Sequence, residues 1–204
     1  MNEMTMAKFG VGARTLRLED KAFITGHGEY TDDVRPDGAL AVAFLRSPIA
    51  AGTFKINDAS GAKSAPGVHL VLTHEDVANM KPLPSRAAAM LPNADGTPTA
   101  VPPHPVLADG RVHHVGVPIA MVVAETQAQA NDAIELIEVD WDSEPAVTDT
   151  ATALDDNAPL VWPDHGSNLA FLYAQGNEAE TNAAFDKAAK TVKLTLLNNR
   201  LVSM

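Results

Sequence analysis

The stretch of residues 112–147 constrains the fold more than any other part of this 204-residue chain. Residues 117–124 form a nearly unbroken apolar run, which is typical of a strand that is covered on both faces. Thr126 and Gln129 then have the spacing of a capping box, in which side chains satisfy the first free N–H groups of a helix. The i, i+3, i+4, i+7 spacing that follows predicts one apolar helix stripe, made by Ala130, Ala133, Ile134 and Ile137.

After this helix the hydrophobic period changes to two. Val139 and Trp141 alternate with acidic residues, which predicts a strand with one buried face and one solvated face, and Pro145 ends it. Because a short helix that joins two strands buries its stripe on the sheet that they share, residues 112–147 should form one strand–helix–strand unit. We expect Ile134 to be a core residue where the helix meets the sheet.

The acidic residues of this unit are candidates for catalysis or metal binding, because paired carboxylates serve both roles. They are Glu135, Glu138, Asp140 and Asp142. All four alternate with the predicted core residues, so a solvated outer face is the better interpretation.

The composition excludes several classes of protein. A net charge of −11 argues against nucleic acid and against an anionic membrane surface as partner. The absence of cysteine excludes disulfides, iron–sulfur clusters and thiol catalysis by this chain. The first twenty residues lack the apolar core of a signal peptide, and no run reaches the ~20 apolar residues of a membrane span. We therefore expect a soluble, cytoplasmic protein.

The chain before residue 112 predicts an arm, two strands and two short helices. Residues 1–34 have few apolar residues and no period, so they are expected to form an arm. Gly10-Val-Gly12 is not a dinucleotide fingerprint, since no strand precedes it and a third glycine is missing. Buried strands are predicted at 40–45 and 68–72. Short helices are predicted at 59–64 and from Thr73 to about Asn79, the first with Asp58 as N-cap.

Two further stretches carry weaker patterns. Residues 81–105 hold seven of the fourteen prolines without a period, and a functional contact arm and a surface excursion are equally compatible with this pattern. Beyond residue 147 the apolar density falls, and Trp162 is a possible anchor. A short helix is predicted at 182–190, followed by strand-like alternation at 191–197.

The seven histidines do not have the spacing of metal ligands. His113 and His114 are adjacent on a predicted strand, so they should point to opposite faces. His69 lies in an apolar strand and is expected to be a core residue. The others lie in predicted turns or loops: His27, His74, His104 and His165.

The remaining candidates for chemistry are few. No serine lies in a Gly-x-Ser-x-Gly elbow, so a hydrolase is not supported. Arg46, at a strand end, could meet a carboxylate of a partner domain or could be a charge at the rim, and both interpretations stay open. We predict no catalytic, cofactor-binding or metal-binding residue within 1–204.

Several short motifs nevertheless occur in a distinctive order. They are Arg14 with Leu18-Glu19-Asp20, Thr25-Gly26-x-Gly28-x-Tyr30-x-Asp32-Asp33, Arg46-Ser47-Pro48-x-Ala50, Pro66-Gly67-Val68, Val115-Gly116-x-Pro118-Ile119-Ala120, Asp132-Ala133, Glu138-Val139-Asp140-Trp141 and Pro145-Ala146-Val147. This order resembles the N-terminal part of the molybdenum-binding large subunit of the xanthine dehydrogenase, aldehyde oxidase and carbon monoxide dehydrogenase family.

The resemblance implies an α+β fold, the α/β hammerhead, with a mixed sheet and short crossing helices. Residues 1–34 would be an N-terminal arm, 35–148 the hammerhead domain, and 149–204 a linker and the beginning of the molybdenum-cofactor-binding domain. Family members are molybdenum hydroxylases, which oxidise an aldehyde, an N-heterocycle or CO with water as the oxygen source. Their molybdopterin site and catalytic glutamate belong to motifs that are absent from 1–204, so this segment is expected to be structural and to bind no cofactor alone.

The resemblance also implies partners: the remainder of the large subunit, an iron–sulfur small subunit and an FAD medium subunit, in a hetero-oligomer. The alternative is a stand-alone, non-catalytic binding or assembly module with the same fold.

Three positions depart from the family's pattern. Ile49 and Ala51 stand where the family often has His, and Val117 stands where it often has Gln or Glu. Because apolar side chains replace polar ones at these positions, packing is the expected role.

Overall fold

The computed structural model describes residues 17–85 and 93–196. Gly10, Gly12, Arg14 and the residues from 197 onward, for which the sequence makes predictions, lie outside the described residues. Within the part that is described, no helix is both long enough and apolar enough to cross a membrane.

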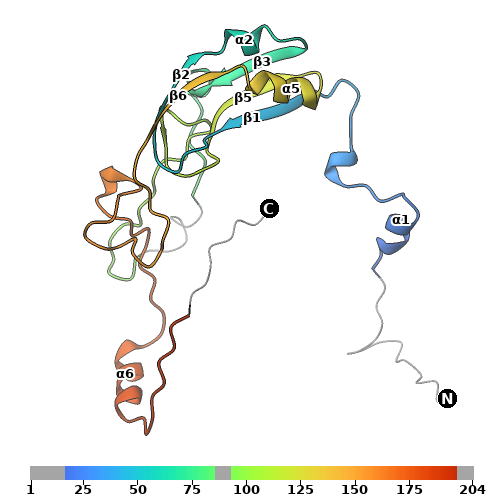
Figure 1. Ribbon diagram of the computed structural model, residues 1–204. Helices are drawn as coiled ribbons and strands as arrows, with labels where there is room; N and C mark the ends of the chain where they lie inside the picture. Colours follow the sequence, from blue (N-terminus) through green and yellow to red (C-terminus); the bar gives the residue numbers. More distant parts are fainter. Residues whose placement is uncertain (1–16, 86–92, 197–204) are drawn as a thin grey trace, which may run out of the picture. The chain divides into compact units, whose positions relative to one another are not determined.

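The structure contains short helices and two three-stranded sheets (Figure 1). In chain order the elements are α1 (Asp20–Ile24), the 3-10 helix η1 (Thr31–Asp33), β1 (Ala41–Arg46), β2 (Gly52–Asp58), α2 (Ser60–Lys63), β3 (Val68–Thr73), α3 (His74–Val77), β4 (Arg111–Val112), β5 (Pro118–Ala124), α5 (Gln127–Ile134), β6 (Glu138–Ser143), the 3-10 helix η2 (Pro163–His165) and α6 (Glu178–Asp186). One sheet has the strand order β1-β5-β3 and the other β4-β2-β6. These elements confirm the predicted α+β class.

The chain divides into two compact units. Among the described residues, the first consists of residues 17–44, 58–71 and 121–138, and the second consists of residues 45–57, 72–85, 93–120 and 139–196.

In the first unit, α5 begins as predicted. The N–H of Gln129 donates to Oγ1 of Thr126 at 3.3 Å, which satisfies one of the free N–H groups at the helix start. Ala130 and Ala133 are fully buried, and Ile137 is buried just beyond the helix, so the predicted stripe is confirmed at these positions. Ile134 is only half-buried, so the prediction of a core residue there is wrong; it is the last residue of α5, and exposed residues follow it.

The strands β1 and β3 were predicted as buried and are strands, but each has exposed apolar side chains. Val42 is 41% exposed and Leu70 is 52% exposed. The reason is the strand order: β5 is central and both neighbours are edges, so only the apolar run of β5 is covered on both faces. The side-chain amide of Gln127 donates to the carbonyl of Val42 at 3.3 Å and covers one polar group of β1.

In the second unit, the core cluster consists of Ala108, Val112 and Ile119. Partly buried side chains pack against it: Leu45, Ile49, Phe54, Ile56, Val117, Val139 and Trp141. The strand β6 shows the predicted alternation, with Val139 and Trp141 half-buried and the acids exposed. However, β5 and β6 belong to different sheets, so the prediction that the helix joins two strands of one shared sheet is wrong. Periodicity reports the burial of a strand but not its hydrogen-bond partner.

The strand β2 was not predicted, although its sequence carries a signal. Phe54 and Ile56 are half-buried and alternate with exposed Thr53 and Lys55. Gly52, at its start, has φ +141°, and the strand pairs antiparallel with β4 there, Gly52 opposite Val112. The period-two pattern of residues 53–56 would have identified this strand.

The remaining elements match the predictions with shifted boundaries. The capping box of α3 is present, with Thr73 N–H donating to Asp76 at 2.7 Å, and the helix ends at Val77. The Asp58 carboxylate accepts the Ser60 N–H at 2.8 Å, although Ala59 holds the N-cap position of α2.

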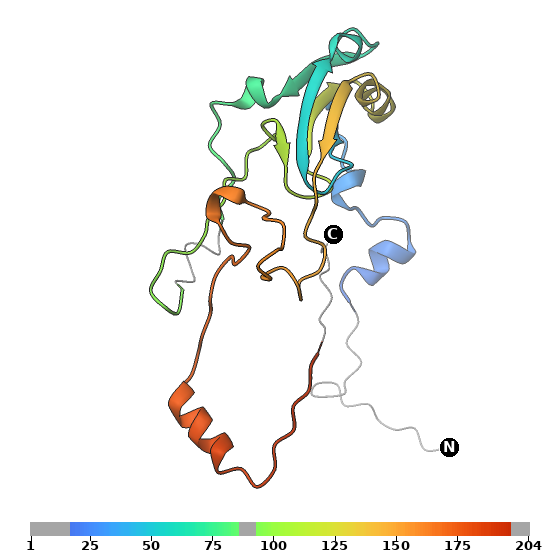
Figure 2. The same cartoon turned by 60° about the vertical axis from the view of Figure 1, so that its left-hand side comes forward.

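The C-terminal part differs more. Helix α6 begins four residues earlier than predicted, because the Asn177 side chain accepts the Glu180 N–H and caps it there. Residues 191–196 alternate as predicted but form no strand, and Val192 is 93% exposed. Figure 2 shows the extended chain on both sides of α6.

Candidate functional site

A cavity of about 510 Å³ lies in the second unit. Its apolar wall is made by Pro102, Pro103, Pro105, Ala108, Val117, Val161 and Trp162. Its polar groups come from His74, His104, Asp109, Arg111, His113 and His114. The end of the proline-rich stretch 81–105 therefore contributes to one wall, and both interpretations of that stretch stay open.

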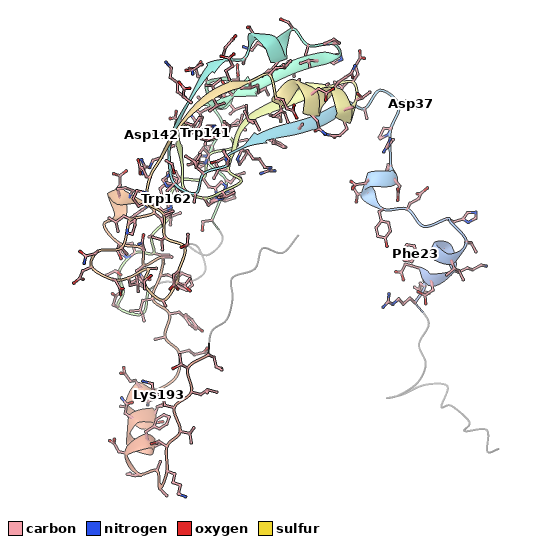
Figure 3. The ribbon with its side chains drawn as sticks, viewed as in Figure 1. Phe23, Asp37, Trp141, Asp142, Trp162 and Lys193 are labelled. Atoms are coloured by element: carbon pink, nitrogen blue, oxygen red, sulfur yellow. The ribbon has the colours of Figure 1, made fainter. Side chains whose placement is uncertain are left out.

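Trp162, labelled in Figure 3, lines this cavity and stacks on the ring of His113. The two rings stack with centroids 3.5 Å apart and an interplanar angle of 22°. Nδ1 of His113 lies 2.7 Å from the Val161 carbonyl oxygen. Because a carbonyl oxygen only accepts, the proton of the neutral ring is on Nδ1 and Nε2 is an acceptor. The predicted anchor role of Trp162 is thereby confirmed.

The His113 ring is held in its neutral form. Burial lowers the pKa of His113, and the nearby charges of Arg111 and His114 lower it further. The hydrogen bond to Val161 and the charge of Glu144 act in the opposite direction on that pKa but do not reverse the shift. His113 is therefore uncharged near neutral pH and keeps its acceptor nitrogen.

The charge of Arg111 is already matched within the chain. Its Nη1 donates to Oε1 of Glu144 at 2.9 Å, and its Nη2 donates to Oε2 of the same carboxylate. This two-pronged ion pair links β4 to the residue that follows β6, and the hydrogen bonds from Arg111 lower the pKa of Glu144. Nε of Arg111 is covered and has no hydrogen-bond partner. Arg111 therefore stabilises the cavity wall through its ion pair with Glu144 and offers no free positive charge to a ligand.

His74 and His114 also form their hydrogen bonds through Nδ1. Nδ1 of His74 lies 3.0 Å from the Leu107 carbonyl, and Nδ1 of His114 lies 2.9 Å from the Val115 carbonyl. Nε2 of His74 lies 3.6 Å from the carboxylate of Asp109. Within residues 17–85 and 93–196, no three His, Asp or Glu side chains gather closely enough to hold a metal ion.

The structure corrects three predictions about histidines. His113 and His114 follow β4 in the chain and are not part of a strand, because the pairing of β4 ends at Val112. His74 is the first residue of α3 and not part of a loop. His69 is not a core residue: its side chain is 48% exposed on the edge strand β3, and Nε2 lies 3.9 Å from Oε1 of Glu125.

The departures from the family's pattern lie at packed positions. Ile49 and Val117 pack against the core cluster of the second unit, which confirms the packing role expected for them. Val117 also lines the large cavity. Ala51 is half-buried and lines a smaller cavity of about 110 Å³, together with His113 and His114.

The remaining sequence candidates lie at the surface. Glu135, Glu138, Asp140 and Asp142 are all exposed, which confirms the solvated-face interpretation. Arg46 is exposed, and its Nη1 donates to the Gly116 carbonyl at 2.9 Å. Both interpretations of Arg46 remain open. The cavity itself was not predicted, because residues far apart in the chain build it.

Comparisons with known proteins give a consistent result. Residues 25–145 match the family described as aldehyde oxidase and xanthine dehydrogenase, a/b hammerhead domain. The chain is 36% identical over 199 residues to the carbon monoxide dehydrogenase large chain of Hydrogenophaga pseudoflava, covering 92% of this chain and 23% of the relative. It is 30% identical to the nicotine 6-hydroxylase large subunit of Paenarthrobacter nicotinovorans, covering 89% of this chain and 21% of that protein.

A solved structure agrees with these sequence relatives. The reconstituted CO dehydrogenase from Oligotropha carboxidovorans superposes with a TM-score of 0.69 at 32% identity, covering 88% of this chain and 22% of that chain. The chain therefore spans less than a quarter of the length of the relatives that it matches.

Proposed function

The chain belongs to the aldehyde oxidase and xanthine dehydrogenase family, and we propose that it forms the N-terminal hammerhead portion of a molybdenum hydroxylase large subunit. The observation that carries this proposal is the hammerhead match over residues 25–145. The relatives support it, since a large chain, a molybdenum-binding subunit and a complex subunit gamma each align with 84–93% of this chain.

The proposed reaction is the hydroxylation of an aldehyde, an N-heterocycle or CO, with water as the oxygen source. Relatives of similar identity are named for carbon monoxide, nicotine, xanthine and aldehyde. Because these names cover CO, N-heterocycles and aldehydes, they support a reaction class and not one substrate.

Within this enzyme we assign the segment a structural, non-catalytic role. A molybdenum cofactor needs protein groups that bind its charged phosphate and surround its metal. Arg111 is already bound by the Glu144 carboxylate, and no cluster of three potential ligands occurs in the part of the chain that the structure describes. These two observations support the assignment of cofactor binding to the rest of the large subunit.

We propose three domain limits: an arm at 1–34, the hammerhead domain at 35–148, and a linker with the beginning of the cofactor-binding domain at 149–204. The exposed alternation of Val192, Leu194 and Leu196 supports a role for residues 191–197 as a strand of that following domain, since such a pattern is stable when one face is covered. An iron–sulfur small subunit, an FAD medium subunit and a cytoplasmic location complete the proposal.

The test compares residues 1–204 with the complete large subunit, obtained by reading the gene past Met204. We expect no stoichiometric molybdenum by mass spectrometry, and no dye reduction with aldehydes or purines, for residues 1–204. The complete subunit, assembled with its partners, should show both. Molybdenum or turnover in residues 1–204 would contradict the non-catalytic role. A stop codon directly after Met204 would instead favour a stand-alone binding or assembly module.

A further inference from the structure

The large cavity of the second unit offers no free guanidinium to an anion. The Arg111 guanidinium is held by both oxygens of Glu144, and the Asp109 side chain is 78% exposed and keeps its contact with water. An anionic ligand would lose its hydration on entry, would face the Asp109 carboxylate and would find no guanidinium free to pair with it. The cavity therefore favours an uncharged occupant over an anionic one.

The cavity does offer hydrogen-bond acceptors. His113 and His114 each donate through Nδ1 to a backbone carbonyl, of Val161 and Val115 respectively. In the neutral ring this leaves Nε2 as an acceptor. Neither Nε2 has a hydrogen-bond partner among the described residues. A ligand that brings an N–H or O–H group would gain a hydrogen bond here.

The walls favour a flat aromatic ring. The rings of Pro102, Pro103 and Pro105 contribute to the lining together with Val117, Val161 and the indole of Trp162. Trp162 is held in place by the His113 stack, so little ordering is required when a ring packs beside it. A volume of about 510 Å³ falls within the range of small-molecule sites, which is roughly 300–1,000 Å³.

We propose that this cavity binds an uncharged, flat aromatic molecule of two or three fused rings that carries an N–H or O–H donor. The apolar walls supply contact area, and the acceptor nitrogen of His113 sets the orientation. The family pattern often has Gln or Glu at the position of Val117, and that longer side chain would fill part of the cavity. The shorter Val117 leaves this space open for the ligand. This inference does not depend on the proposed function.

The test titrates residues 1–204 by calorimetry with three probes of similar shape. Indole carries the donor, 1-methylindole lacks it, and indole-3-carboxylate adds a negative charge. We expect saturable binding of indole, with 1-methylindole weaker by about fivefold, the usual value of one hydrogen bond. Indole-3-carboxylate should be weaker by about tenfold or more, because its charge finds no partner.

Two substitutions connect binding to this cavity. Val117→Gln should weaken indole binding by about tenfold or more by filling the space, whereas the control Val101→Gln, at an exposed position outside the lining, should leave it unchanged. If Val117→Gln fails to fold, His113→Phe keeps an aromatic ring beside Trp162 and removes the acceptor. In that variant indole and 1-methylindole should bind equally.

Three results would overturn the proposal: no saturable indole binding, equal affinity of the unaltered chain for indole and 1-methylindole, or full affinity in both the Val117→Gln and the His113→Phe variants.

Discussion

Replacing Gly52 with alanine should separate two strands of the second unit. Gly52 has φ +141°, a conformation that side-chain-bearing residues rarely adopt. A Cβ there would overlap the carbonyl oxygen of Asp142 and lie 3.0 Å from Cδ1 of Ile49. Because the Asp142 carbonyl oxygen belongs to the backbone of β6, it cannot rotate away from the new Cβ as a side-chain atom would. The strands β2 and β6 would have to move apart.

The expected cost combines two effects. Backbone strain contributes roughly 1–3 kcal/mol, and forcing an extra carbon into a packed site contributes roughly 1–3 kcal/mol. Alanine also lowers the conformational entropy of the unfolded chain, which offsets about 0.4–1 kcal/mol of this cost. The net loss of unfolding free energy is therefore about 3 kcal/mol.

Gly116→Ala is the matched control. Gly116 lies in the same unit with φ +88°, and nothing lies within 4 Å of its added Cβ. It carries the backbone strain without the overlap, so its cost should be about 1 kcal/mol.

Urea unfolding, followed by the fluorescence of half-buried Trp141, measures both variants. With a denaturant slope of about 2 kcal/mol per molar, the midpoint should fall by about 1.5 M for Gly52→Ala and by about 0.5 M for Gly116→Ala. Equal midpoints for the two variants would refute the argument, because the approach of Asp142 would then carry no cost.

Three other measurements test different parts of the structure. Ile134→Ala should cost about 1–2 kcal/mol, less than for a fully buried isoleucine, while exposed Glu135→Ala stays within about 0.5 kcal/mol in urea melts; equal midpoints would show that the helix face is wrong. Because the pKa of His113 is lowered in the folded chain, the unfolded chain binds more protons, so stability should be full above about pH 6.5 and fall as the pH drops below it. His113→Phe should remove that part of the pH dependence of the urea midpoint, and an unchanged profile would contradict the assignment. Hydrogen exchange on residues 1–204 should label 1–34 and 81–105 faster than the strands, and the rest of the large subunit or the small iron–sulfur subunit should slow it; segments as protected as the strands in the isolated chain would show that they belong to the domain's own core.

The elements around β5 could be predicted because their signals are local. The unbroken apolar run, the Thr126 cap and the alternation of β6 each depend on neighbours within a few residues, and each was confirmed. The motif order was equally local and led to the family that the comparisons support. The strand β2 carried the same kind of signal at residues 53–56.

The tertiary structure decided what depends on distant residues. Hydrogen-bond partners place β5 and β6 in different sheets, and their order makes β1 and β3 edges with exposed apolar side chains. The cavity joins His74, His113 and Trp162, and the stacked pair is separated by 48 residues of chain. A periodic pattern reports which side of an element is buried, because burial repeats with the backbone. It does not report which element covers that side, because long-range packing makes that choice.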